Sequence, residues 1–246
     1  MGKRKNSKNI NKILLALIAV IIVGIAGYFN IEDEQHTNKP INENKISYTT
    51  SFDLTSVPAF TNEPYVVLNE NKPNFSEEDF SKETFEEYSP LDYLGRCGVA
   101  FAKVGKETMP KEPRGEIGME KPSGWKTAKY DIIDGKYLYN RCHLIGYQLT
   151  AENANEKNLI TGTRYMNVQG MLPFENMVAE YVKSTNNHVL YRVTPIFEGE
   201  NLVASGVQIE AESVEDKGEN ICFNVYVYNV QPGININYSN GESIEI

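Results

Sequence analysis

An uninterrupted apolar run from Ile13 to Phe29 is the feature that most restricts what this chain can fold into. No water-exposed segment tolerates an apolar stretch of this length, which suits a helix across a lipid bilayer. Five basic residues precede the run: Lys3, Arg4, Lys5, Lys8 and Lys12. Because basic flanks stay on the cytoplasmic side, we expect residues 1–12 in the cytoplasm and everything after about Asn30 outside the membrane.

A cleaved signal peptide is the alternative interpretation of this segment. It requires a shorter apolar core followed by a site of small residues, and Gly24 to Gly27 forms only a weak version of such a site. The sequence therefore favours an uncleaved transmembrane signal-anchor over residues 13–29. Residues 30–57 are rich in Asn, Glu, Lys, Ser and Thr without an apolar period, which predicts a flexible tether.

Residues 58–246 have the length and composition of one folded domain. Apolar segments bounded by turn residues predict strands over residues 64–68, 99–104, 188–197, 201–210 and 221–230. A serine cap and an acidic first turn predict a short helix over residues 76–88. Apolar residues at helical spacing predict a second helix over residues 173–183, with Pro173 in its first turn. We therefore expect a mixed α+β domain.

The charge of the chain is unevenly distributed. The net charge is −9, and removing the five positive charges of residues 1–12 leaves −14 for the exported part. Residues 96–192 nevertheless contain 14 Lys and Arg against 10 Asp and Glu. An acidic exported protein suits a cell-envelope interaction module, whereas a basic centre suits a protein that binds phosphate.

The most informative stretch is Tyr-Asn-Arg-Cys-His-Leu-Ile-Gly at residues 139–146. Asn158, Asn167 and Glu175 follow His143 at successive spacings of fifteen, nine and eight residues. Hydrolysis of a phosphodiester needs a base for the attacking water, positive charge near the phosphate oxygens, and stabilisation of the leaving oxygen. His143, Arg141 and a metal ion could supply these. Magnesium keeps several waters and needs few protein ligands, so the carbonyl oxygen of Asn167 is an adequate one.

Glu175 lies two helical turns beyond Asn167 if the intervening chain is helical, which would place both residues on one face. Pro173 makes a continuous helix uncertain at the level of sequence. The carboxylate of Glu175 could then bind waters around the metal ion.

The segment Asn140-Arg-Cys-His143 resembles the Asp-Arg-Gly-His signature of the sugar-non-specific DNA/RNA endonucleases, the ββα-metal family. Within that family the chain looks most similar to bacterial membrane-anchored DNA-entry nucleases, from about Leu91 to Val230. The resemblance implies a ββα-metal nuclease fold with a central antiparallel sheet and flanking helices. It also implies hydrolysis of DNA, with RNA left open, to 5′-phosphate ends with Mg²⁺ or Mn²⁺.

The same resemblance assigns roles to individual residues. His143 would be the general base, Asn167 the single direct metal ligand, and Asn158 a residue that orients the active-site loop. Glu175 falls where the family has a glutamate that binds metal-bound waters, and Arg141 where an arginine contacts phosphate. A histidine that acts as base must be neutral, so activity should fall as the pH drops through its pKa.

Two positions depart from the family signature. Asn140 replaces the aspartate, and Cys142 puts a side chain where the family has glycine. One hypothesis is that Cys142 forms a disulfide with Cys97 or Cys222 and so steadies the segment that carries His143. The three thiols of an exported chain allow at most one such bond.

Further basic residues are candidates for binding the substrate backbone: Arg164, Lys126, Lys129 and Arg96. Phosphate contacts dominate affinity for nucleic acid, but these residues could equally be ordinary solvated charges. Two other functions stay open: a catalytically silent, membrane-tethered protein that captures nucleic acid, and an envelope module that never binds it. A Cys142–His143 nucleophile is disfavoured because neighbouring strand residues point to opposite faces. The scattered cysteines and histidines show no zinc-ligand spacing.

Overall fold

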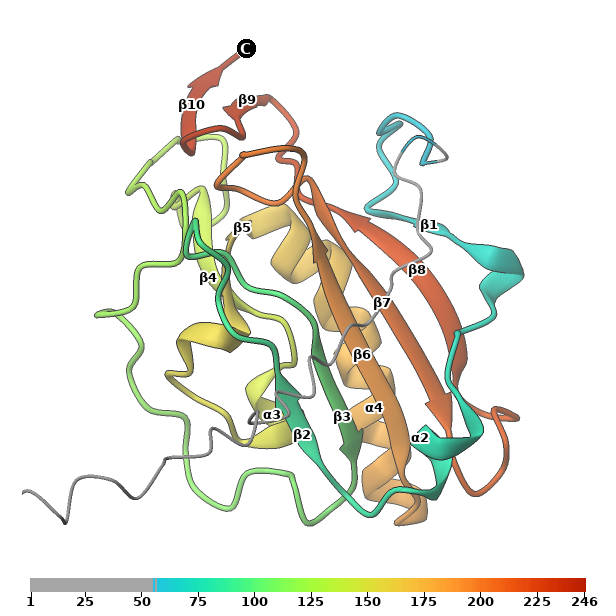
Figure 1. Cartoon of the computed structure of the whole chain (residues 1–246). Coiled ribbons are helices and arrows are strands. Elements are labelled where there is room, and N and C mark those ends of the chain that lie inside the picture. Colours follow the sequence, from blue (N-terminus) through green and yellow to red (C-terminus); the bar gives the residue numbers. More distant parts are fainter. Residues whose placement is uncertain (1–54, 56) are drawn as a thin grey trace, which may run out of the picture. The chain divides into compact units, whose positions relative to one another are not determined.

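The computed structural model describes residue 55 and residues 57–246. At the centre of this part is a six-stranded sheet with strand order β1-β8-β7-β6-β3-β2, in which every neighbouring pair is antiparallel (Figure 1). Its strands are β1 (Tyr65–Val67), β2 (Glu86–Tyr88), β3 (Ala100–Val104), β6 (Val189–Ile196), β7 (Gly206–Ser213) and β8 (Cys222–Tyr228).

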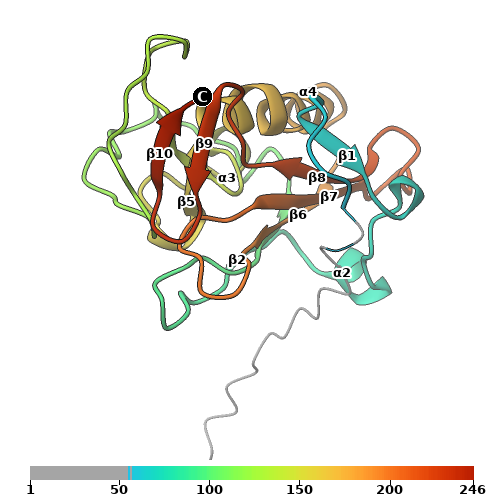
Figure 2. The ribbon, with the colours of Figure 1, turned by 90° about the horizontal axis from the view of Figure 1, so that it is seen from above.

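The main core lies between this sheet and helix α4 (Leu172–Thr185). Strand residues alternate between faces, so Phe223, Val225 and Val227 of β8 share the face toward α4. The helix buries Val178 and Val182 against the same cluster. Each such side chain contributes about 1.5–3 kcal/mol when fully buried. Figure 2 shows α4 and the short helix α3 (Tyr147–Thr150) on this one side of the sheet.

A separate β-hairpin carries the segment that resembles the nuclease signature. It consists of β4 (Tyr139–His143) and β5 (Leu159–Thr163), paired antiparallel with His143 opposite Leu159. Asn229, which is fully buried at the end of β8, fastens this hairpin to the main sheet. Its Oδ1 accepts from the Thr163 N–H at 2.8 Å, and its Nδ2 donates to the Thr161 carbonyl at 3.1 Å.

The hairpin continues into the helix without an intervening loop. The π-helix η4 (Met166–Met171) leads directly into α4, whose first residue, Leu172, has helical backbone angles. Pro173 is the second residue of α4, and α4 follows the π-helix η4 directly. The hairpin and the following helix therefore form one unbroken strand-strand-helix unit, and the interruption that Pro173 suggested does not occur.

A C-terminal hairpin completes the domain with a second, smaller core. Its strands β9 (Ile234–Asn237) and β10 (Glu242–Glu245) pair antiparallel. Ile234 and Ile236 pack with Leu138 and Tyr139 at the start of β4. The remaining elements are α2 (Glu77–Ser81) and the 3-10 helices η2 (Asn69–Asn71) and η3 (Glu156–Asn158).

The expected helix over residues 76–88 is wrong in its second half. Ser76 and Asp79 form a reciprocal capping box that starts α2, but the helix ends at Ser81. Residues 86–88 instead form β2, because Glu87 pairs with Phe101 of β3 and the ring of Phe85 packs edge-on against Phe101 at 4.9 Å.

Two further expectations need correction. The strand expected over residues 201–210 is displaced to Gly206–Ser213, while the carbonyl of Asn201 accepts a hydrogen bond from Arg96. No disulfide exists, because all three cysteines are free. Cys142 is fully buried beside Gly162 and Met166, where glycine at position 162 leaves room for its sulfur.

The signal-anchor expected over residues 13–29 lies outside the described residues. Within the described part, no helix combines the length and apolar character that a membrane span requires. The other expected strands and the helix over residues 173–183 are present with small shifts of their ends.

Candidate active site

His143 ends strand β4 and is almost fully buried. Its Nε2 lies 2.8 Å from the carbonyl oxygen of Asn153, which can only accept a hydrogen bond, so Nε2 carries the proton of the neutral ring. The other nitrogen, Nδ1, then carries the lone pair, which accepts a long hydrogen bond from Arg114 Nη2 at 3.5 Å. Burial lowers the pKa of His143 below its ordinary value of 6.5, and the charge of Arg114 acts in the same direction. His143 is therefore a neutral base with a defined basic atom.

Arg114 is a site residue that the sequence analysis missed. It extends from the long loop between β3 and β4, and its Nη2 lies 3.5 Å from His143 Nδ1. Its positive charge lowers the pKa values of His143, Cys142 and Glu175 alike, which places the guanidinium among these three groups. Arg114 is exposed to solvent, so its charge is available to an incoming phosphate.

Asn158 binds the backbone of the segment that follows His143. Its side chain is fully buried and bonds both backbone groups of Ile145, with Oδ1 accepting from the N–H at 2.9 Å and Nδ2 donating to the carbonyl at 3.0 Å. The carbonyl of Asn158 also accepts from the Leu144 N–H at 2.9 Å. These bonds fix residues 144–146, which link His143 to α3. Asn158 thus fixes the backbone that directly follows His143.

Asn167 lies in the π-helix η4, opposite the beginning of β4. Its Nδ2 donates to Asn140 Oδ1 at 3.1 Å, which directs its own Oδ1 away from the strand. Within the described part of the chain, no residue donates a hydrogen bond to Asn167 Oδ1. A single amide oxygen left open in this way suits a hard divalent cation that keeps most of its waters. The donor chemistry of Asn167 therefore fits the expected metal ligand.

Glu175 lies in the first turn of α4 beside Gly146. Burial raises the pKa of Glu175 to about 7, against the opposing influence of Gln148 and of the Arg114 charge. A partly buried carboxylate with little compensating charge favours a cation nearby. Among residues 55 and 57–246, no three His, Cys, Asp or Glu side chains gather as a metal site.

Arg141 contacts the protein's own backbone. Its Nε donates to the Glu120 carbonyl at 2.5 Å and its Nη2 to the Gly118 carbonyl at 2.7 Å, while its guanidinium stacks over the Trp125 ring at 4.1 Å. These contacts fix the loop that also carries Arg114. Because carbonyl partners do not neutralise its charge, Arg141 still contributes positive potential at the surface.

The other basic candidates occupy different surroundings. Arg164 forms an ion pair with Asp134 at 2.8 Å and lines the same cavity as Arg141. Lys126 is exposed, and Lys129 lies over the ring of Tyr137 at 4.4 Å. Arg96 bonds Asp92 at 2.7 Å and the carbonyls of residues 199 and 201, with only 13% of its side chain exposed. The contacts of Arg96 favour a structural role in tying two loops together.

The sequence analysis did not identify Arg114 and Asn153 as site residues, because only tertiary contacts bring them to His143. Arg114 precedes His143 by 29 residues in a loop without periodic pattern. Asn153 supplies a backbone carbonyl, and any residue type could do that. Its side-chain Oδ1 is also buried without a hydrogen-bond partner among the described residues. Only the fold places these groups around His143.

The β4–β5 hairpin carries a neutral, oriented histidine, and the helix that follows carries the amide of Asn167 and the carboxylate of Glu175. This arrangement matches the strand-strand-helix order implied by the sequence resemblance. The family model for DNA/RNA non-specific endonucleases matches residues 75–215, so the chain belongs to that family.

Individual relatives agree with this assignment. A deoxyribonuclease of Streptococcus dysgalactiae subsp. equisimilis is 33% identical over 197 residues, which cover 63% of this chain and 59% of the relative. The chain therefore spans less than two thirds of that protein. The magnesium-bound crystal structure of NucA from Streptococcus agalactiae is 25% identical, with a TM-score of 0.66 over 75% of this chain and 88% of that one. The zinc-bound Sda1 nuclease is 26% identical, with a TM-score of 0.62 over 75% and 97%.

Proposed function

We propose that this protein is a metal-dependent, non-specific endonuclease that hydrolyses phosphodiester bonds of DNA, with RNA as a second substrate class, and leaves 5′-phosphate ends. The observation that carries the proposal is the fixed orientation of His143, whose Nε2–H is held by the Asn153 carbonyl while Nδ1 stays basic. Membership of the endonuclease family and similarity to a deoxyribonuclease support the choice of substrate.

The side chains divide the reaction between them. His143 Nδ1 takes a proton from the attacking water, and Arg114 places its positive charge near the phosphate oxygens. A bound Mg²⁺ or Mn²⁺ would supply positive charge near the leaving 3′ oxygen, held by Asn167 Oδ1 and by waters on Glu175. The relatives with bound magnesium and zinc support a divalent ion in this role. Asn158 keeps the histidine-bearing strand in place throughout.

The location of the enzyme is part of the same proposal. The basic residues before the apolar run at residues 13–29 support a single-pass anchor in the cell membrane with the catalytic domain outside. An extracytoplasmic nuclease attached to a tether can act on nucleic acid that reaches the cell surface.

The test uses the full chain in mild detergent and closed circular plasmid DNA, with Mg²⁺ or with EDTA. We expect nicking that requires Mg²⁺, is lost in Asn167→Ala and is retained in Asn176→Ala, which changes an exposed asparagine on α4. Nicks that DNA ligase reseals without a kinase step would establish 5′-phosphate ends. Binding of DNA without cleavage under all conditions, by folded protein, would refute the endonuclease and favour a tethered capture protein.

A further inference from the structure

Residues 58–67 form an arm that lies against the helix carrying the candidate metal ligand. The family model begins at residue 75, so the arm lies outside the matched region. At the end of the arm, β1 pairs with β8, with Tyr65 opposite Val227. Figure 2 shows β1 beside β8, at the edge of the sheet near α4. The arm is therefore close to both the sheet and the η4–α4 segment.

An aromatic cluster joins the arm to the residue that precedes η4. The ring of Phe60 meets the ring of Tyr165 edge-on, with ring centroids 6.0 Å apart. The same ring meets Tyr228 of β8 edge-on at 5.6 Å. Edge-to-face contact at about 4.5–7 Å is a favoured geometry for aromatic pairs. Because Tyr165 directly precedes η4, Phe60 connects the sheet to the start of that helix.

Two tyrosine hydroxyls hold the backbone of the arm on either side of Phe60. The hydroxyl of Tyr165 donates to the Asn62 carbonyl at 2.9 Å. The hydroxyl of Tyr228 donates to the Pro58 carbonyl at 2.6 Å. Both acceptors are backbone atoms, so these hydrogen bonds fix the path of the arm itself. Tyr165 is thus bound to the arm by its ring and by its hydroxyl.

The arm also contacts η4 and the first turn of α4. A Cβ at Gly170 in η4 would lie 3.8 Å from the carbonyl oxygen of Pro64 and would overlap Val227. The ring of Tyr65 meets the ring of Phe174 in α4 edge-on at 4.9 Å. Together with the contact before η4, these contacts extend from the start of η4 into α4. Position 170 accommodates this close packing because it has no side chain.

Asn167 lies between these contacts, as the second residue of η4. A π-helical turn is rare and occurs frequently at functional sites, so its shape depends on the elements that pack against it. At the start of the turn, the Tyr165 N–H also donates to Gln231 Oε1 at 3.1 Å, and Asn167 Nδ2 donates to Asn140 at 3.1 Å. The arm adds a support from outside the strand-strand-helix unit. The position of the Asn167 carbonyl oxygen therefore depends on how firmly η4 is held.

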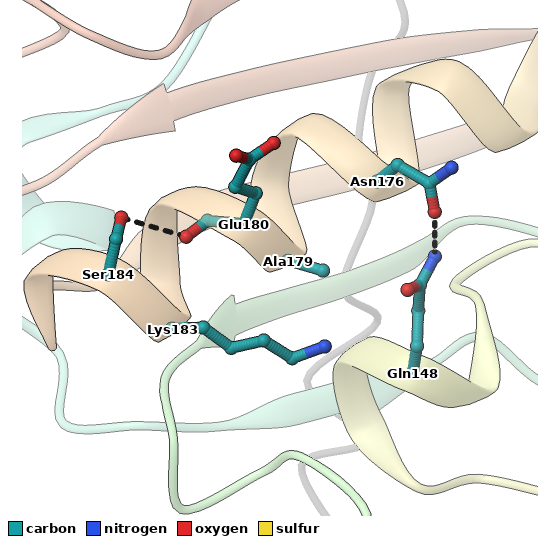
Figure 3. A pocket seen from close by; sticks show the side chains of 6 residues that line it. All are labelled: Gln148, Asn176, Ala179, Glu180, Lys183 and Ser184. Atoms are coloured by element: carbon teal, nitrogen blue, oxygen red, sulfur yellow. Dashed lines mark hydrogen bonds between the residues drawn. The ribbon is translucent and has the colours of Figure 1, made fainter.

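The body of α4 has supports that do not involve the arm. Figure 3 shows the cavity between α3 and α4, where Gln148 Nε2 donates to Asn176 Oδ1 at 2.9 Å. Near the other end of α4, the hydroxyl of Tyr181 donates to Asp216 at 2.9 Å. Loss of the arm contacts should therefore disturb η4 more than it disturbs α4.

We propose that residues 58–67 are a clasp that positions the metal ligand Asn167, with Tyr165 as the positioning residue. The inference rests on the proposed metal-dependent endonuclease function. Residues 61–63 of the clasp are exposed and lie outside the main core, so the clasp acts on the metal site more than on folding. The tether expected over residues 30–57 would lead directly into the clasp.

The first test measures Mg²⁺ binding to the full chain in mild detergent by calorimetry, without nucleic acid. Tyr165→Phe removes the hydroxyl that holds Asn62, and Phe60→Ala removes the ring that joins Tyr165 to β8. Each should weaken Mg²⁺ binding about threefold to tenfold, which is less than the roughly 10–100-fold effect of losing a group that bonds a ligand directly.

The matched control is Tyr181→Phe. It removes a tyrosine hydroxyl that also donates at 2.9 Å, but from the part of α4 that the clasp does not contact. Tyr181→Phe should bind Mg²⁺ like wild type, and thermal unfolding of each variant establishes that it is folded. An equal loss of Mg²⁺ affinity in Tyr181→Phe would overturn the clasp, because the effect would then be general to the helix.

The second test is amide hydrogen exchange of the metal-free full chain, followed in a peptide over residues 164–172. Exchange in this peptide should be about threefold or more faster in Tyr165→Phe and Phe60→Ala and unchanged in Tyr181→Phe. The double variant of Phe60 and Tyr165 should lose less Mg²⁺ affinity than the product of the two single losses, because both act through one contact. Unchanged exchange in both single variants would overturn the clasp.

The outcomes for the clasp and for the endonuclease are distinguishable. If wild-type protein nicks plasmid with Mg²⁺ while both clasp variants bind Mg²⁺ like wild type, the clasp is wrong and the enzyme stands. If the clasp variants lose Mg²⁺ affinity as expected while wild-type protein never nicks plasmid, the clasp stands on a metal-binding protein without endonuclease activity.

Discussion

At the scale of single residues, burial shifts the pKa values of Glu175 and His143 in opposite directions, and the charge of Arg114 acts on both groups. The pKa of Glu175 is raised to about 7, whereas that of His143 is lowered. Below pH 7 an unliganded Glu175 is therefore mostly protonated and cannot hold the waters of a cation, whereas His143 stays mostly neutral down to pH 6.5 because its pKa lies below that value. Protons should thus compete with Mg²⁺ for Glu175 before they titrate the base.

We predict that Mg²⁺ affinity, measured by calorimetry without substrate, falls as the pH drops from about 8 to 6. Glu175→Gln should bind Mg²⁺ about 10–100-fold more weakly at pH 8, and its affinity should vary little with pH over this range. An equally strong pH dependence in the glutamine variant would assign the titration to another group.

At the scale of elements, the approach of α4 to the loop after β4 depends on the lack of a side chain at Gly146. A Cβ at this position would lie 2.6 Å from Glu175 Cδ, and no real Cβ atom comes that close. Because the end of a glutamate side chain can rotate away, Gly146→Ala should fold with little loss of stability but with a displaced carboxylate.

We predict that Gly146→Ala reduces Mg²⁺ affinity about tenfold or more, the scale of losing a group that orients metal-bound water. Gly118→Ala is the matched control, because a Cβ there meets no atom within 4 Å. Chemical denaturation of both variants should give nearly equal free energies of unfolding. A large loss of stability in Gly146→Ala with unchanged metal affinity would contradict the account.

The sequence was sufficient to predict those elements whose apolar residues recur at strand or helical spacing. Alternation in β8 and helical spacing in α4 were sufficient, because each buries one face against the other. Residues 86–88 could not be predicted, since they form a strand only by pairing with β3. For the site, the spacing of His143, Asn158, Asn167 and Glu175 identified candidates through family resemblance. Arg114 and Asn229 act across long sequence separations, which no local pattern encodes.

At the scale of the whole molecule, His188 joins three segments at the end of the main sheet. Its Nδ1 lies 2.5 Å from Glu215 and its Nε2 lies 3.0 Å from Glu107. Both nitrogens can donate only when the ring is protonated. Although partial burial acts against it, the hydrogen bonds and charges of Glu215 and Glu107 raise the pKa of His188, and hydrogen bonds hold the pKa values of both glutamates below 4.5.

The signs of these shifts define a pH window for stability. The histidine contribution is complete below its unfolded pKa of about 6.5 and is lost as the pH rises through the higher folded value. The glutamate contribution is complete above about 4.5 and is lost as the pH falls. We predict that urea unfolding of wild type relative to His188→Gln shows the largest difference near pH 5–6. Because these three side chains are partly exposed to solvent, the difference in unfolding free energy should not exceed about 1 kcal/mol. A difference that grows toward pH 9 would contradict this network.

The central claim is that His143 is the base for phosphodiester hydrolysis, and the rate of plasmid cleavage by His143→Ala at saturating Mg²⁺ tests it most directly. The control is His188→Gln, which removes the other histidine that the structure describes. We predict a loss of about 10²–10⁴-fold for His143→Ala, the usual contribution of a general base, and a nearly unchanged rate for His188→Gln. A folded His143→Ala variant that cleaves at the wild-type rate would contradict the account.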